Sequence, residues 1–139
     1  MLHVAGCVII TDQQILLLHK INPARYELPG GKLENGETAE DAAKREVQEE
    51  LLCEVQIIKK LNEIEFEEDD QIIHYTRFLA MIKKGQQPRI GEKEKFDDVR
   101  FVHICDIPAH NSITAKRASS GRDSLRIRSN MPPLADPVW

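Results

Sequence analysis

The sequence predicts an α/β domain in which short strands surround one amphipathic helix. Two observations carry this prediction: apolar runs bounded by turn residues recur along the chain, and residues 38–51 lack proline and glycine and repeat apolar side chains at helical spacing. A chain of 139 residues with 41% hydrophobic and 30% charged residues is typical of one globular domain. We expect a single domain over residues 1–139, with an extended tail from about residue 127.

The first elements are two paired strands at residues 2–10 and 15–19. Both runs are apolar, and the polar stretch at residues 11–14 between them favours a turn. Pro23 breaks the pairing that follows, because proline cannot donate to a strand ladder and restricts the residue before it. We therefore predict a loop at residues 21–25 and a short extended segment at residues 26–28. A sharp glycine turn is predicted at residues 29–31.

Residues 38–51 are predicted to form a helix. Thr38 followed three residues later by Asp41 resembles a capping box, in which the threonine hydroxyl accepts from a backbone amide of the first turn. Apolar residues recur every four positions and form a stripe along one helical face: Ala39, Ala43, Val47 and Leu51. We expect this stripe to pack against the sheet.

Two strands at residues 54–64 and 71–82 are expected to flank an acidic turn at residues 67–70. A polar loop over residues 85–95 leads into another strand at residues 98–104. Near the end of the chain, residues 106–108 are predicted to start a short helix and residues 113–125 to be partly helical. The tail is predicted to be extended because it contains Pro132, Pro133 and Pro137. We expect this tail, which ends in Trp139, to pack on its own core or on a second subunit, so a homodimer stays open.

Composition and charge exclude several classes of function. The apolar runs are too short to cross a bilayer and no signal peptide is recognisable, so we expect a cytoplasmic protein. The net charge of −4 argues against a general nucleic-acid surface, which needs a basic field. The three cysteines lack metal-ligand spacing and are interpreted as reduced core residues: Cys7, Cys53 and Cys105. The five histidines also lack such spacing and are interpreted as ordinary residues: His3, His19, His74, His103 and His110.

The candidate chemistry lies in three glutamates of the predicted helix. Glu46, Glu49 and Glu50 occupy positions i, i+3 and i+4, which places their side chains within one sector of about 100°. Like charges at this spacing destabilise a helix by a few tenths of a kcal/mol per pair, roughly. A divalent cation would reverse that effect, and Mg²⁺ accepts carboxylate oxygens together with water and substrate phosphates.

An isolated acidic helix face is more often merely solvated. Here the face has a specific context: a glycine turn precedes the helix, Glu37 stands just before it, and Arg45 adjoins the first clustered carboxylate. Residues 31–53 resemble the Nudix box, G-x5-E-x7-R-E-U-x-E-E-x-G-U, where U is a bulky apolar residue. The matching positions are Gly31, Glu37, Arg45, Glu46, Val47, Glu49 and Glu50.

The resemblance implies an α/β/α sandwich with a mixed central sheet and a loop-helix-loop metal site. It further implies a hydrolase that uses Mg²⁺, or Mn²⁺, to cleave a phosphoanhydride bond in a nucleoside diphosphate linked to another group, or in a nucleoside triphosphate. By this similarity the metal ligands are the carboxylates of Glu46, Glu49 and Glu50 and the carbonyl of Gly31. Arg45 is expected to orient a carboxylate such as Glu37 or Glu49.

Other roles are less defined by the box. Glu46 is the first candidate for the general base, and Glu92 and Glu94 on a later loop are the alternatives. Substrate contacts are expected from cationic and aromatic side chains near the box: Arg25, Tyr26, Lys32, Arg77 and Phe96.

One position departs from the box, because Leu52 replaces its second glycine. That glycine would end the helix in the left-handed region, which leucine enters at a cost of about 1–2 kcal/mol. We predict that the exit turn changes while the carboxylates stay in place. Two alternatives remain open: a nucleotide-binding sensor that kept the fold but lost turnover, and an enzyme acting on capped RNA or a dinucleoside polyphosphate.

Overall fold

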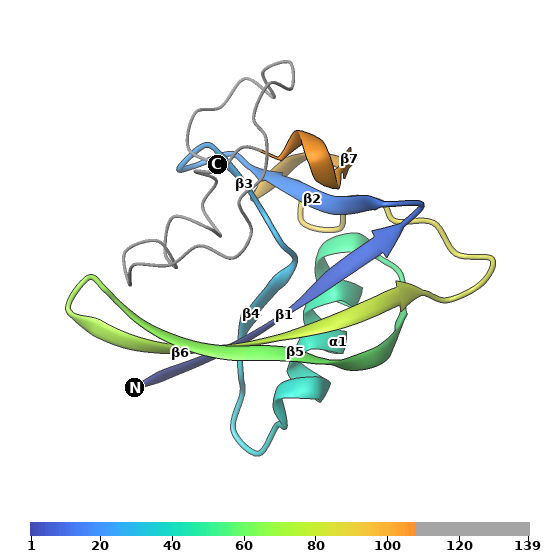
Figure 1. Cartoon of the computed structure of the whole chain (residues 1–139). Coiled ribbons are helices and arrows are strands. Elements are labelled where there is room, and N and C mark those ends of the chain that lie inside the picture. The colour runs from blue at the N-terminus through green and yellow to red at the C-terminus, as the bar shows by residue number, and fades with distance from the viewer. Residues whose placement is uncertain (108–139) are drawn as a thin grey trace.

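The computed structural model describes residues 1–107, and the predictions for residues 113–125, for the tail from residue 127 and for His110 lie outside this range. The described chain contains one α-helix, seven strands and a short 3₁₀ helix (Figure 1). In chain order these are β1 (Leu2–Thr11), β2 (Gln14–Lys20), β3 (Arg25–Glu27), β4 (Gly30–Lys32), α1 (Ala39–Leu51), β5 (Val55–Glu68), β6 (Gln71–Ile82), β7 (Phe96–His103) and η1 (Ile104–Asp106).

The sheet is mixed, as the resemblance implies. β1 runs parallel to β6 from Leu2 opposite Ile73 to Ile9 opposite Ala80, and β5 pairs with β6 antiparallel. β4 lies antiparallel along the other edge of β1. β2 forms a hairpin with the end of β1 and carries β3 and β7. β1 therefore joins the two halves of the sheet.

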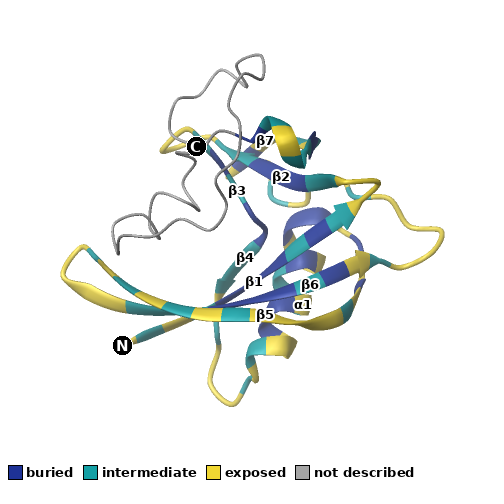
Figure 2. Ribbon diagram, viewed as in Figure 1, coloured by how far each residue is buried: buried dark blue, intermediate teal, exposed yellow. Residues whose placement is uncertain are grey.

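Helix α1 packs on one face of this sheet through the predicted apolar stripe. Ala43, Val47 and Leu51 are fully buried, and Ala42 joins them. They form a core with alternate residues of β1, including Cys7 and Ile9 (Figure 2). Burying a side chain such as Val47 or Leu51 stabilises the fold by about 1.5–3 kcal/mol. This packing fixes the position of the glutamates that the helix carries.

The start of α1 confirms one half of the predicted capping box. The Thr38 hydroxyl accepts a hydrogen bond from the Asp41 amide at 3.1 Å.

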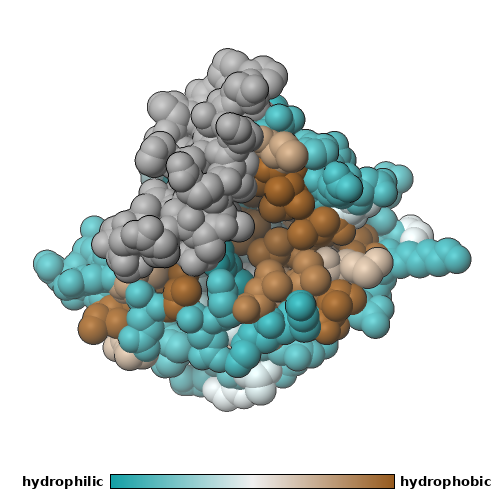
Figure 3. All heavy atoms as spheres, in the orientation of Figure 1, coloured by the Kyte–Doolittle hydropathy of each residue, from teal (hydrophilic) through white to brown (hydrophobic). Residues whose placement is uncertain are grey.

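Apolar side chains gather over the β1 and β2 region of the molecule on the face shown in Figure 3. No helix within residues 1–107 is long and apolar enough to cross a membrane.

Several predicted bounds are wrong. The segment at residues 29–31, predicted as a turn, contains the start of β4, because Gly30 pairs with Gly6 at a close approach that side chains would obstruct. β5 continues to Glu68, and the turn is confined to Asp69 and Asp70, both at positive φ. The strand predicted from residue 98 begins at Phe96. Asp106 is the last residue of η1, and the rest of the helix predicted to start at residues 106–108 lies outside the described residues from residue 108 onward.

Two predictions about individual side chains are also corrected. Cys7 and Cys53 are buried and free, as predicted, but Cys105 is exposed because it lies in η1 at the surface. Phe96 is 3% exposed and belongs to the main core, so it is not placed to stack on a base.

The exit from α1 keeps the left-handed conformation despite Leu52. This residue has φ 55° and ψ 36°, and its amide donates to the Gln48 carbonyl at 3.1 Å. The predicted change of the exit turn is therefore wrong. The Arg89 amide donates to the Leu51 carbonyl at 2.7 Å, and the Gly91 amide donates to the Glu50 carbonyl at 2.8 Å. These bonds satisfy helix-end carbonyls and offset the strain at Leu52.

We expect Leu52→Gly to stabilise the protein by about 1 kcal/mol, because glycine adopts the left-handed region without a Cβ clash. Leu52 is 44% exposed, so its removal forfeits only part of the burial of a core leucine. Urea unfolding of both proteins would measure the difference. A variant less stable than the parent would indicate that contacts of Leu52 with Gly91 outweigh the backbone strain.

Candidate functional site

The candidate site forms where β4 passes alongside α1. Glu50 is 5% exposed, and its Oε1 accepts a hydrogen bond from the Gly30 amide at 3.0 Å. Burial, together with the nearby carboxylates of Glu46, Glu27 and Glu92, raises the pKa of Glu50 to about 9, although the hydrogen bond from Gly30 opposes this shift. The helix thus holds a carboxylate in an environment that disfavours its negative charge.

Glu46 lies one turn earlier on α1 and faces Gly31. A side chain at Gly31 would collide with the Glu46 carboxylate, so the glycine leaves room for that group. Burial is the largest cause that raises the pKa of Glu46, and the Arg45 guanidinium opposes it. Gly31 and Glu46, which the resemblance implies as ligands of one metal, therefore lie side by side.

Arg45 connects the box residues, as expected. Its Nε donates to Glu37 at 2.7 Å, and its NH1 group donates to Glu46 and Glu49, each at 3.2 Å. Its NH2 group donates to the Lys32 carbonyl at 3.0 Å. Hydrogen bonds to Glu37 are the largest cause that raises the pKa of Arg45, and Arg45 in turn lowers the pKa of Glu37. One guanidinium thereby ties the loop before α1 to the acidic face of the helix.

The later loop brings Glu92 to the site. The hydrogen bonds from Arg89 and Gly91 dock this loop on the end of α1, and a side chain at Gly91 would collide with the Glu49 carbonyl. The charge of Glu92 is a smaller cause that raises the pKa of both Glu46 and Glu50. Glu94 is exposed. Of the two alternative base candidates on this loop, the structure brings Glu92 to the helix.

The structure distinguishes the three helix carboxylates, which look equivalent in the sequence. Glu50 bonds to β4, Glu46 faces Gly31, and Glu49 pairs with Arg45 and has a half-exposed side chain. Across residues 1–107, no three histidine, cysteine, aspartate or glutamate side chains are gathered into a metal cage. Mg²⁺ is commonly held by one or two carboxylates, with water and substrate phosphates completing its shell.

The donor set fits such an ion. Glu46 and Glu50 are oxygen donors whose pKa values are raised mainly by burial and further by neighbouring carboxylates, of which Glu92 acts on both, and a divalent cation would compensate these effects. The assignment of Glu46, Glu49, Glu50 and the Gly31 carbonyl as ligands remains a prediction.

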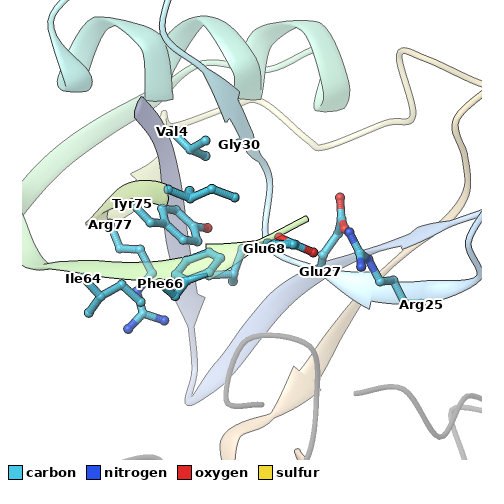
Figure 4. Close-up of a pocket in the computed structure, with 11 residues that line it drawn as sticks. Val4, Arg25, Glu27, Gly30, Ile64, Phe66, Glu68, Tyr75 and Arg77 are labelled. Atoms are coloured by element: carbon cyan, nitrogen blue, oxygen red, sulfur yellow. The ribbon is translucent and has the colours of Figure 1, made fainter. Parts of the chain in front are cut away.

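A pocket of about 180 Å³ adjoins this carboxylate group and is lined by residues of β3, β4, β5 and β6 (Figure 4). Gly30 connects the pocket to the carboxylates, since it lines the pocket and its amide donates a hydrogen bond to Glu50. Phe66 and Tyr75 supply aromatic walls, and the Arg77 guanidinium lies 5.9 Å from the centre of the Tyr75 ring. The pocket therefore offers flat apolar surface and charged groups next to the candidate metal ligands.

The predicted substrate contacts divide into two groups. Arg25 and Arg77 line the pocket, where Arg25 donates to Glu27 at 3.0 Å and Arg77 donates to Asn62 at 3.1 Å. Tyr26 does not line it: its side chain is buried beside His19 and Arg100. Lys32 is exposed on β4 and contributes its carbonyl to Arg45.

Sequence reasoning missed Glu27, Ile64, Phe66, Glu68, Ile73 and Tyr75, which also line the pocket. Alternation in β5 and β6 puts Ile64, Phe66, Ile73 and Tyr75 on one face of the sheet. The alternation was readable in the sequence, but only the pairing of β5 with β6 brings these four residues beside Gly30.

Comparison with known proteins gives a consistent picture. A family model described as NUDIX domain matches residues 1–121. The chain is 41% identical over 100 residues to the putative 8-oxo-dGTP diphosphatase YtkD of Bacillus subtilis, covering 72% of this chain and 61% of that protein. It is 37% identical over 69 residues to the 8-oxo-dGTP diphosphatase of Escherichia coli, covering 50% of this chain and 52% of that protein. The matches therefore span less than two thirds of these relatives.

Solved structures share the fold. The MutT NUDIX hydrolase from Burkholderia pseudomallei superposes with a TM-score of 0.70 at 24% identity, covering 76% of this chain and 85% of that one. A Caenorhabditis elegans Ap4A hydrolase gives a TM-score of 0.65 at 19% identity, covering 75% of this chain and 81% of that one. Together with the mixed sheet and α1, these similarities confirm the predicted fold class.

Proposed function

Because the chain belongs to the NUDIX domain family, we propose that it is a divalent-metal-dependent pyrophosphohydrolase that cleaves a phosphoanhydride bond in a nucleotide derivative. The observation that carries this proposal is the buried Glu50, which accepts a hydrogen bond from Gly30, together with a pocket that the same glycine lines. A fold alone does not demand a buried carboxylate with a raised pKa.

The metal ion, its ligands and Arg45 would each have a separate role in the reaction. A bound Mg²⁺ or Mn²⁺ would neutralise charge on the diphosphate and lower the pKa of a water molecule. Glu46, Glu49 and Glu50, with the Gly31 carbonyl, would hold that ion. Arg45 keeps Glu46 and Glu49 in orientation through its hydrogen bonds to both.

Glu46 is our first candidate for the general base, because its partly buried carboxylate has a raised pKa that suits proton abstraction. Glu92 is the second, since its charge acts on the same two carboxylates. In either case the proton of the attacking water passes to a carboxylate oxygen, and the leaving phosphate departs with the bonding electron pair.

The pocket supports a nucleotide substrate. Phe66 and Tyr75 provide surfaces on which a base can stack, while Arg25 and Arg77 provide positive charge near the phosphates. The names of the relatives from B. subtilis and E. coli make an oxidised guanine nucleoside triphosphate the first substrate to assay. The sensor alternative loses its motivation, because Leu52 adopts the left-handed conformation that the box glycine would adopt.

The test is hydrolysis of a panel of nucleotides with Mg²⁺ or Mn²⁺: 8-oxo-dGTP, nucleoside diphosphate sugars, ADP-ribose and dinucleoside polyphosphates. We expect Glu49→Gln and Glu50→Gln each to reduce kcat at least about 100-fold, because each removes a charged ligand oxygen. Glu54→Gln, at an exposed glutamate just beyond the end of α1, serves as the matched control and should keep activity within about twofold. Unchanged turnover in both helix variants would reject the proposal.

A further inference from the structure

The face of the sheet that carries α1 is only partly covered by it. The helix of 13 residues spans about 20 Å, whereas β5 with 14 residues spans about 46 Å. The β5–β6 ribbon therefore continues well beyond the N-terminus of α1, and its far part is largely exposed (Figures 1 and 2). A groove remains where the helix begins.

This groove has a volume of about 590 Å³, within the usual range for small-ligand sites. Ala39 and Glu40 at the start of α1 form one side, and Lys59 of β5 lies on the other. Thr76 and Phe78 of β6 belong to its floor. Because side chains alternate along β6, this groove and the pocket of Tyr75 and Arg77 lie on opposite faces of the sheet.

Thr76 is the unexplained group in this groove. It is 6% exposed, yet within residues 1–107 its hydroxyl makes no hydrogen bond to another group. It sits between Ala5 and Glu63 in the sheet register and lines the groove. A buried hydroxyl without a partner costs about 1–3 kcal/mol, so the position favours a ligand that can bond to it.

Both carboxylates that line the groove, Glu40 and Glu63, are paired with cationic side chains. The Glu63 carboxylate is paired with Lys60 and accepts from His74 Nε2 at 2.8 Å, and Glu65 accepts from Nδ1 of the same ring at 3.1 Å. Both ring nitrogens of His74 thus face carboxylates, which raises its pKa, and Glu65 is the larger cause. Glu40 is paired with Lys44 at 3.3 Å.

Lys59 has no carboxylate partner among the described residues. The amides of Ala39 and Glu40 likewise make no hydrogen bond within residues 1–107, as expected for the first turn of a helix. These amides and the helix dipole favour an anion at the N-terminus of α1.

We propose that this groove is a second ligand site that binds a small phosphomonoester, of the size of a nucleoside monophosphate. The phosphate lies between the first turn of α1 and Lys59, where it accepts from the free amides and from the Thr76 hydroxyl. The apolar part of the ligand rests on Leu33, Ile57 and Phe78. Binding needs no divalent metal and no hydrolysis, so this site is independent of the catalytic proposal.

The test is a titration of the full chain with adenosine monophosphate in the presence of EDTA, followed by amide chemical shifts and calorimetry. We expect the largest shifts at the amides of Ala39, Glu40 and Thr76. Adenosine without the phosphate should bind at least about tenfold more weakly, since it lacks the charge. Inorganic phosphate should shift the Ala39 and Glu40 amides but leave those around Phe78 unchanged.

Two variants and one control sharpen the result. Thr76→Val preserves shape and Lys59→Gln preserves length, and each should weaken binding about tenfold because each removes a contact to a charged phosphate. Lys84→Gln, at an exposed lysine outside the groove, should bind as the parent does. Absence of binding, shifts confined to the amides of Gly30, Tyr75 and Arg77, or unchanged affinity in Lys59→Gln would overturn the proposal, even if Thr76→Val failed to fold.

Discussion

Glu50→Gln is expected to make the metal-free protein more stable than the parent above neutral pH, by roughly 3 kcal/mol at pH 8. The pKa of Glu50 is about 9 in the folded protein and near 4.5 ordinarily. Between these values the folded state retains a proton that the unfolded state releases, so stability falls as the pH rises from about 4.5 towards 9. Each pH unit between these two pKa values corresponds to about 1.4 kcal/mol of stability, and coupling of Glu50 to Glu46 and Glu92 reduces the total loss of stability.

Urea unfolding in EDTA at pH 5.5 and pH 8 would measure this effect. The parent should lose stability over that interval, whereas Glu50→Gln should lose much less, because the glutamine does not ionise. Added Mg²⁺ should stabilise the parent at pH 8 more than the variant, since the cation compensates the buried Glu50 charge that only the parent carries. Identical pH slopes for the two proteins would contradict the assignment of a buried, protonated Glu50.

The second large effect is expected for Arg45→Lys, which should lower kcat by about 10–100-fold and raise the Mg²⁺ concentration needed for half activity. Arg45 bonds to Glu37, Glu46 and Glu49 and to the Lys32 carbonyl. Lysine keeps the charge but lacks the planar fork that reaches several acceptors at once. Glu46 and Glu49 would then lose the group that orients them.

The matched control is Lys44→Gln, one position earlier on the same helix. Lys44 makes an exposed ion pair with Glu40 at 3.3 Å, and such pairs contribute about 0.3–0.5 kcal/mol. This variant should retain activity and nearly all stability. Steady-state kinetics across a Mg²⁺ titration would compare the two, and full activity of Arg45→Lys would show that the guanidinium does not position the carboxylates.

The sequence by itself determined the local elements and the composition of the candidate metal site. The apolar repeat of α1, the hairpin turn after β1 and the spacing of Glu46, Glu49 and Glu50 depend on neighbours a few residues apart, which local periodicity expresses directly. The contact of Arg45 with Glu37 and Glu49 was expected from the resemblance to the box, because Glu37 lies in the loop before α1, beyond the reach of helical periodicity. The bounds of β4 and β5 were not, because they depend on which strands they pair with.

Only the tertiary structure decided how the three glutamates differ. Glu50 is buried because β4 crosses α1 at Gly30, twenty residues earlier in the chain, and Glu92 joins the group because its loop caps the same helix. The left-handed conformation of Leu52 is likewise maintained by hydrogen bonds from Arg89 and Gly91 to the helix end. Pockets form where strands that are distant in sequence lie side by side. The sequence pattern identifies the side chains on each strand, but it does not show which strands are neighbours.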